Sequence, residues 1–317
     1  MRVHIDRFRR LDGSLEARVA RVGDGSIITR FDRTPFPRAD DDVVCPHFLE
    51  LKWATGCPYS CAWCYLQGTL RFFDYGTKPK PKSYERVEDH LQAFFDGDGI
   101  RPELLNSGEL SDSLMMENSR RPFSTFVMSL FDTQTRHRVL FVTKSANVEK
   151  LMHVPNVDQA VVSFSLNSKR VSRRWEAAAP GVQDRIEAAG RLKDAGFEVR
   201  VRIDPMVPIA EWKKDYSELV ESMFRRFVPD RITLGSLRGL QSTIVNSRDR
   251  SWLHFLDERS NWGKKVAAET RLAMYSAVIE RLKSKHNYRR IALCKETVGM
   301  WNALGMNYRR MRCNCTQ

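Results

Sequence analysis

Three cysteines lie within eight residues of the sequence, in the stretch KWATGCPYSCAWCYLQG from Lys52 to Gly68. They are Cys57, Cys61 and Cys64, and neither a histidine nor a fourth cysteine accompanies them. A structural zinc site normally takes four ligands, often as two separated pairs, and a second pair is missing here. A cubane iron–sulfur cluster has four irons, so three local thiolates leave one iron open to a ligand that is not protein. The stretch therefore favours a cluster with an open iron over a zinc loop or three incidental cysteines.

The spacing Cys-x3-Cys-x2-Cys, followed at once by Tyr65, resembles the radical S-adenosylmethionine (SAM) superfamily, and ATGCPYSCAWCYLQ resembles its spore photoproduct lyase branch. The resemblance implies that Cys57, Cys61 and Cys64 bind a [4Fe–4S] cluster whose open iron is chelated by SAM. It also implies reductive cleavage of SAM to a 5′-deoxyadenosyl radical, with a reductase such as a flavodoxin or ferredoxin as partner. The cofactor carries the homolysis in such enzymes, and the protein supplies orientation and exclusion of solvent.

The resemblance covers roughly residues 45–210 and includes several expected strand ends, where ligands gather in a parallel barrel. Gly108 and Glu109 resemble the segment that meets the methionyl amino group, because a small residue permits close backbone approach and a carboxylate pairs with an ammonium. Lys144, in FVTK, resembles a lysine that contacts SAM in the lyase branch. The complete set of expected SAM-binding residues is Tyr65, Gly108, Glu109, Lys144, Ser165, Asn167 and Arg202, with Ser236 completing the ring.

One departure concerns the hydrogen donor of the lyase branch. The photoproduct lyases carry a cysteine in the segment corresponding to LNSGELSDS, and it returns a hydrogen atom to the product radical. This sequence has no cysteine between Cys64 and Cys294, and Trp63 stands two residues before Tyr65. We therefore expect a relative of the lyases that uses the same radical on another substrate.

Four cysteines lie outside the loop: Cys45, Cys294, Cys313 and Cys315. Cys294 can be a buried small hydrophobe, whereas a Cys-x-Cys at a basic carboxyl terminus is poor core material. The tail pair has three interpretations: a second cluster completed with Cys294, for which Cys45 can supply a fourth ligand; a thiol hydrogen donor or redox pair; or residues without a role. Tyr65, Cys313 and Cys315 are the candidates for radical quenching. We predict that the C-terminal segment folds back over the mouth of the barrel and carries a tail sulfur to the cluster-bearing face.

Short apolar stretches alternate with helical patterns, which predicts parallel β/α units. The expected strands are residues 47–54, 102–108, 138–145, 159–167, 198–208 and 231–237, and the expected helices are residues 83–97, 119–134, 182–196 and 212–228. This order predicts an α/β fold, a partial (β/α)6 TIM-like barrel of the radical SAM type. We expect an irregular N-terminal extension at 1–47, the barrel at 48–238, and a C-terminal cap or substrate segment at 239–317 with a long helix from about Gly263 to Lys285.

The composition is basic, with 52 Lys and Arg against 39 Asp and Glu and a net charge of +13. Such an excess favours polyanions, although a basic solvated surface without a partner has the same composition. Residues 69–82 and 239–265 combine aromatic and basic side chains, which suits stacking on bases and neutralising phosphates, or else core packing beneath solvated charges. No apolar stretch is long enough to span a membrane, and no apolar leader follows the basic N-terminus, so we expect a cytoplasmic protein.

The leading hypothesis is a radical SAM enzyme that abstracts hydrogen from a nucleotide-type substrate, free or within nucleic acid. A first alternative is a radical tailoring enzyme of small-molecule biosynthesis, which forms a carbon–sulfur bond at the expense of a second cluster. A second alternative is a non-catalytic iron–sulfur protein that binds nucleic acid, and SAM cleavage distinguishes it from both enzymes.

Overall fold

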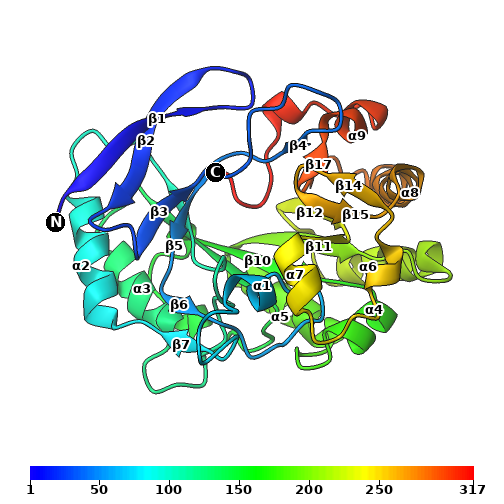
Figure 1. Ribbon diagram of the computed structural model, residues 1–317. Helices are drawn as coiled ribbons and strands as arrows, with labels where there is room; N and C mark the ends of the chain where they lie inside the picture. The colour runs from blue at the N-terminus through cyan, green and yellow to red at the C-terminus, as the bar shows by residue number, and fades with distance from the viewer.

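The computed structural model describes residues 1–317, and its centre is a ten-stranded sheet that curves into an open barrel (Figure 1). Seven neighbouring strands are parallel, and three antiparallel strands extend the sheet at one edge. In sheet order the strands are β1 (Val3–Arg9), β2 (Leu15–Val22), β3 (Ile28–Phe31), β5 (Phe48–Leu51), β8 (Leu104–Asn106), β9 (Arg138–Thr143), β10 (Ala160–Leu166), β11 (Glu198–Met206), β12 (Arg231–Ser236) and β16 (Ile291–Leu293). The α/β partial barrel expected from the sequence is confirmed.

Helices cover the outer face of the parallel strands (Figure 1). They are α2 (Tyr84–Phe95), α3 (Phe123–Phe131), α4 (Lys169–Trp175), α5 (Val182–Asp194), α6 (Trp212–Arg226) and α8 (Ala268–His286), with the shorter α1 (Leu66–Thr69), α7 (Gln241–Asn246) and α9 (Val298–Ala303). Ser83 and Ser168 cap α2 and α4, because each hydroxyl accepts a hydrogen bond from a backbone N–H in the first turn. No helix of the structure is long and apolar enough to cross a membrane.

Three small sheets flank the barrel. They are β13 (Arg238–Gly239) with β15 (Gly263–Lys265) and β14 (Glu258–Ser260), β17 (Glu296–Thr297) with β4 (Val43–Val44), and β6 (Ala54–Thr55) with β7 (Lys80–Pro81). Short 3-10 turns complete the chain at η1 (Leu151–His153), η2 (Val157–Gln159), η3 (Leu253–Phe255) and η4 (Tyr308–Arg310).

The polar interior of the barrel follows from the alternation of β11. Successive side chains of a strand point to opposite faces, so Val199, Val201 and Ile203 enter the apolar core while Arg200 and Arg202 face the barrel interior. The sequence EVRVRID therefore determines which groups line the interior.

Two expectations about the ends of the chain were wrong. The N-terminal segment is not irregular, because β1, β2 and β3 continue the main sheet as antiparallel strands. The long C-terminal helix begins at Ala268 rather than Gly263. Gly263 has φ of 90°, which an α-helix cannot accommodate, and it starts β15 in a small antiparallel sheet.

Candidate functional site

The cysteine loop follows the first barrel strand and is fixed by backbone hydrogen bonds. The Gly56 N–H donates to the Leu110 carbonyl and the Cys57 N–H donates to the Thr77 carbonyl, both at 2.9 Å. A side chain on Gly56 would lie 2.2 Å from the Lys78 carbonyl oxygen, and its φ of 82° is left-handed, so glycine is required here. The loop is thereby held beside the segment that follows β8.

All three loop cysteines border one cavity of about 280 Å³. Its other walls include Arg174 and Trp175 of α4 and Arg248 beyond α7. Burial raises the pKa of each thiol, that of Cys61 to about 12. No three ligand side chains converge on a single-ion position anywhere in residues 1–317. A four-iron cluster is larger than one ion, and three thiols facing a shared cavity without a fourth ligand fit its donor set.

Lys144 lies beside this loop, at the carboxyl end of β9. Its backbone N–H donates to Asp112 at 2.6 Å, and its Nζ lies 3.6 Å from the carboxylate of Glu176. Burial by itself lowers the pKa of Lys144, but the charges of Glu176 and Cys61 raise it above its ordinary value. Glu176 also pairs with the buried Arg185 at 2.8 Å, so the lysine belongs to a charged network bordering the cysteines.

Tyr65 connects the cysteine loop with the carboxyl end of β8. Its hydroxyl donates a hydrogen bond to the Glu109 carbonyl. Burial raises the pKa of Tyr65 well above its ordinary value, and the charge of Glu109 raises it further. A Cβ on Gly108 would lie 2.5 Å from Val142, so glycine is needed there for packing against β9. Glu109 therefore sits between the loop and the barrel interior.

The structure distinguishes two candidates at the end of β10. Asn167 is fully buried and directs its amide toward protein groups, donating to the Pro205 carbonyl at 2.8 Å and accepting from Tyr216 at 3.1 Å. The hydroxyl of Ser165 makes no hydrogen bond within the protein, although its carbonyl accepts one from Arg185. Ser165 therefore retains a free polar group, and Asn167 supports the fold around it.

Arg202 meets the carboxyl tail inside the barrel. Its Nη2 lies 3.1 Å from Cys315 Sγ, and its buried Nε has no hydrogen-bond partner. Burial by itself lowers the pKa of Arg202, but Cys315, Cys294 and Asp204 outweigh burial and raise it. Arg202, which the sequence suggested as a SAM-binding residue, therefore contacts a tail cysteine in this structure.

The tail enters the interior of the barrel rather than covering its mouth, which corrects the sequence expectation. Asn314 is fully buried; its Nδ2 donates to Ser163 at 2.8 Å and its Oδ1 accepts from Thr233 at 2.8 Å. At the amino-terminal ends of β11 and β12, Arg200 donates to the Asn314 carbonyl at 2.9 Å and Arg231 to the Thr316 carbonyl at 2.9 Å. Figure 1 shows the C-terminus within the arc of strands.

The pKa values of the two tail thiols are shifted in opposite directions. A hydrogen bond from Cys313 lowers the pKa of Cys315 to about 6, and Arg202 lowers it as well. The same hydrogen bond, together with burial, raises the pKa of Cys313 well above its ordinary value. The charge of Cys45 raises the pKa of both Cys294 and Cys313, and the charge of Cys315 raises the pKa of Cys45. Arg202 lowers the pKa of both Cys294 and Cys315. All four cysteines outside the loop therefore gather at the barrel interior.

Several residues that border these sites carried no signal in the sequence. Glu176, Trp175 and Arg174 lie on or beside a helix that is remote from the cysteine loop in the chain, and Asp112 lies on the segment after β8. Asp204 forms a two-pronged ion pair with Arg238, at 2.8 and 2.9 Å. The alternation of EVRVRID is the one pattern that predicts which of these side chains face inward.

A curved parallel sheet with a three-cysteine loop after its first barrel strand defines the radical SAM class of folds. The family model for spore photoproduct lyase matches residues 47–235, which is more than half of the chain. The chain belongs to the spore photoproduct lyase family.

Individual relatives agree with this assignment. The curated spore photoproduct lyase of Clostridium acetobutylicum is 27% identical over 177 residues, which are 54% of this chain and 50% of that protein. The chain therefore spans about half the length of the curated relatives it matches.

Solved structures confirm the fold. Spore photoproduct lyase complexed with dinucleoside spore photoproduct has a TM-score of 0.65 and 17% identity, covering 77% of this chain and 75% of that one. A cysteine variant of the lyase with bound AdoMet and the same dinucleoside has a TM-score of 0.64 and 17% identity, covering 78% and 76%.

Proposed function

We propose that this chain is a radical SAM enzyme that abstracts hydrogen from a nucleotide-type substrate, free or within nucleic acid. The observation that carries the proposal is the family match over residues 47–235, which includes the cysteine loop. AdoMet and a dinucleoside photoproduct in related lyase structures support the cofactor and the substrate class. With a [4Fe–4S] cluster and SAM bound, the site would supply a 5′-deoxyadenosyl radical after reduction by a donor of the flavodoxin or ferredoxin type.

The residues of the chain have separate roles in this proposal. Cys57, Cys61 and Cys64 hold the cluster through their thiolates. Glu109 pairs with the ammonium of SAM, and the free hydroxyl of Ser165 supplies a further hydrogen bond. Lys144 and Gly108 complete the SAM site, while the buried hydrogen bonds of Asn167 keep the end of β10 in position.

The barrel interior supports a way to quench the substrate radical without the cysteine of the lyase branch. Tyr65 and Glu109 lie between the cysteine loop and Arg202, and Arg202 contacts Cys315 at 3.1 Å. Cys313 stays protonated beside Cys315, because burial and the adjacent sulfur raise its pKa. We assign hydrogen return to this tail pair, with Tyr65 as the group nearest the loop.

A second candidate function rests on the four cysteines at the barrel interior. Cys45, Cys294, Cys313 and Cys315 are the number of thiols that a second cubane cluster requires. A second cluster beside the substrate favours radical tailoring with sulfur insertion, and iron content distinguishes it from a hydrogen donor.

The test is anaerobic reconstitution followed by reduction with dithionite in the presence of SAM. We expect about four irons for one cluster or about eight for two, with release of 5′-deoxyadenosine. Cys57→Ala should abolish SAM cleavage and the iron of the SAM-binding cluster. Stoichiometric zinc without sulfide would overturn the cluster assignment. A stable cluster that never cleaves SAM would instead favour the non-catalytic nucleic-acid-binding alternative.

A further inference from the structure

A second cavity, of about 550 Å³, opens at the opposite end of the barrel from the cysteine loop. Glu198, Arg231 and Ile291 border it, and they are the first residues of β11, β12 and β16. The cysteine loop lies at the carboxyl ends of the strands, so the two cavities are separate. Five arginines line the second one: Arg231, Arg289, Arg290, Arg310 and Arg312.

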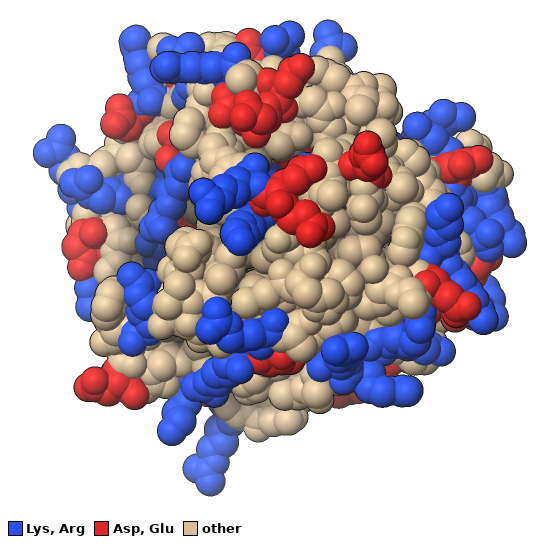
Figure 2. All heavy atoms as spheres, turned by 45° about the vertical axis from the view of Figure 1, so that its right-hand side comes forward, with Lys and Arg blue, Asp and Glu red and all other residues tan.

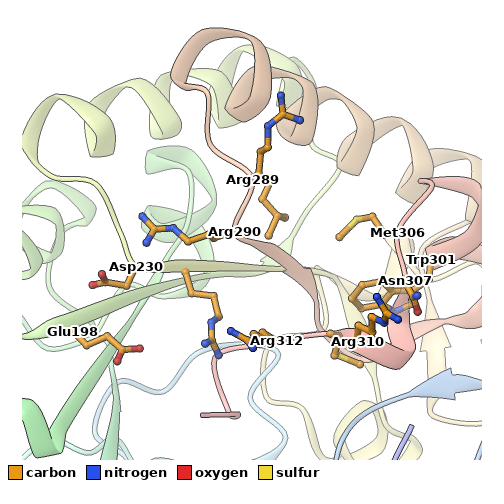
Figure 3. A pocket seen from close by; sticks show the side chains of 12 residues that line it. Glu198, Asp230, Arg289, Arg290, Trp301, Met306, Asn307, Arg310 and Arg312 are labelled. Carbon is orange, nitrogen blue, oxygen red and sulfur yellow. The ribbon is translucent and has the colours of Figure 1, made fainter. Parts of the chain in front are cut away.

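The acidic residues of this cavity are already paired with cations outside it. Glu198 pairs with Arg138 at 2.8 Å and with Arg200 at 2.6 Å, and Asp230 pairs with Lys193 at 2.6 Å. Figure 3 shows both carboxylates on one side of the cavity, away from Arg310 and Trp301. The two acids therefore leave most of the arginine charge in the cavity uncompensated.

The positive charges that line one cavity repel one another, and an anion among them reduces this repulsion. Burial, together with the charges of Arg200 and Arg312, lowers the pKa of Arg231 to about 10. Arg310 and Arg312 line the cavity, are exposed to solvent and form no ion pair. The arrangement therefore favours an anion in the cavity.

A buried donor provides a second observation that points to a ligand. Trp301 lines the cavity, is 1% exposed, and its indole Nε1–H donates no hydrogen bond. A buried N–H without an acceptor costs free energy, and native structures rarely leave one unpaired. An acceptor oxygen of a ligand would satisfy it once the cavity wall shifts enough to expose the N–H.

We propose that this cavity binds the phosphate group of a nucleotide or of a nucleic-acid backbone. Guanidinium groups match phosphate geometry with paired hydrogen bonds, and several arginines around a concave site suit a compact anion with many acceptor oxygens. Ile291, Met306 and Met311 also line the cavity, and their apolar side chains can contact the organic part of the ligand. The site does not depend on SAM chemistry, so it stands or falls separately from the proposed reaction.

The cavity also adjoins the tail that enters the barrel. Arg231 borders the cavity and donates to the Cys313 carbonyl at 2.6 Å and to the Thr316 carbonyl at 2.9 Å. Arg312 borders the cavity and directly precedes Cys313. A bound phosphate would therefore hold the segment that carries the two tail cysteines.

The experiment measures binding to the anaerobically reconstituted protein, without SAM or reductant, by calorimetry. The probes are pyrophosphate, thymidine 5′-monophosphate and a short single-stranded oligonucleotide without terminal phosphates. Arg310→Gln combined with Arg312→Gln should weaken binding by about tenfold or more, because each removes a charge-assisted contact. Arg309→Gln, which changes the same charge at a residue outside the cavity, should leave affinity within about twofold of the parent.

Hydrogen exchange then locates the ligand. Protection of residues 289–291 and 306–312 from exchange when the tightest-binding probe is present supports the site. Trp301→Phe should lower the affinity for that probe, in a protein that still unfolds cooperatively on heating. Tighter binding of the mononucleotide identifies a free nucleotide, and tighter binding of the oligonucleotide identifies a nucleic-acid backbone. The proposal is overturned if no probe binds, if Arg309→Gln weakens binding as much as the cavity variants do, or if poly-glutamate binds equally well.

Discussion

Glu109 is the residue whose charge most directly tests the proposed SAM site. Its carbonyl accepts a hydrogen bond from Tyr65, and its carboxylate lies near enough to influence the pKa of Arg202. A carboxylate in this position can pair with either the ammonium of SAM or the guanidinium beside it. Removing its charge tests the first role, because a pairing with the ammonium contributes directly to SAM affinity.

Glu109→Gln is predicted to weaken SAM binding by roughly 1.5–3 kcal/mol, the scale of a hydrogen bond to a charged group, while the iron content stays constant. Equilibrium binding to the reconstituted protein measures the affinity. Glu149→Gln is the matched control, because Glu149 is exposed and pairs with Arg191 on the surface. Unchanged SAM affinity in Glu109→Gln would move the ammonium contact to another residue.

The tail cysteines are tested together. Cys313→Ala with Cys315→Ala should leave reductive SAM cleavage intact and lower substrate turnover, because the substrate radical then lacks a positioned S–H group from which to take a hydrogen atom. Full iron content with an accumulating substrate radical identifies a hydrogen donor, whereas loss of about four irons identifies a second cluster. Normal turnover with normal iron in the double variant would show that neither role belongs to these residues.

At the scale of the elements, β11 joins the two ends of the barrel. Its inward side chains begin with Arg200, which holds the tail, continue with Arg202 at Cys315, and end with Asp204 paired to Arg238. Buried charges are tolerated when each has a partner, and here the partners come from β11, the tail and β13. The strand therefore fixes the depth at which each tail residue lies.

The segment between β8 and α3 contains a carboxyl group whose protonation affects stability. Glu117 is 2% exposed, and burial raises the pKa of its carboxyl group to about 7. The folded protein binds this proton more tightly than the unfolded chain does, so its stability decreases as the pH rises from about 4.5 to about 7. Above pH 7 the loss is complete.

Glu117→Gln should therefore stabilise the protein at pH 8 by up to roughly 3 kcal/mol and have little effect near pH 4.5. Thermal unfolding across this pH range measures the difference. Glu88→Gln, at an exposed position of α2, is the control and should not change the pH dependence. Equal stabilisation at both pH values would contradict the assignment to Glu117.

At the scale of the whole molecule, the net charge of +13 is distributed over the surface. Figure 2 shows Lys and Arg spread around one face, with fewer Asp and Glu among them and no single basic patch. Two segments combine aromatic and basic side chains. In residues 69–82, Phe72 is 80% exposed and the guanidinium of Arg71 lies over its ring. In residues 239–265, Trp252 is buried in the core. The first segment is therefore the better candidate for stacking on a base.

If nucleic acid is the substrate, its affinity should fall by about a thousandfold or more between 50 and 200 mM salt, because several phosphates are neutralised at once. Phe72→Ala should weaken binding by roughly 1–3 kcal/mol without changing the slope against salt, since stacking releases no counterions. Fluorescence anisotropy with single-stranded DNA measures both. A flat salt response would favour a free nucleotide.

The sequence by itself determined the cysteine loop and the order of the barrel strands. Cys57, Cys61 and Cys64 are adjacent in the chain, and β5 to β12 are apolar stretches whose alternation is a local property. The helix of residues 212–228 was predicted for the same reason, and it appears as α6. Patterns with a period of two or about four residues need no knowledge of the rest of the chain.

Only the tertiary structure decided what the remaining cysteines meet. Cys45 and Cys315 are at opposite ends of the sequence, yet they share the barrel interior because β3 and β5 close one side of the sheet and the tail enters it. The same holds for β16, a seventh parallel strand too short to show a pattern, and for Gly263, whose left-handed φ excludes it from the start of the expected helix. Contacts between segments that are distant in the sequence depend on how those segments pack against each other in the folded chain. Local sequence periodicity predicts helices and strands but does not predict this packing.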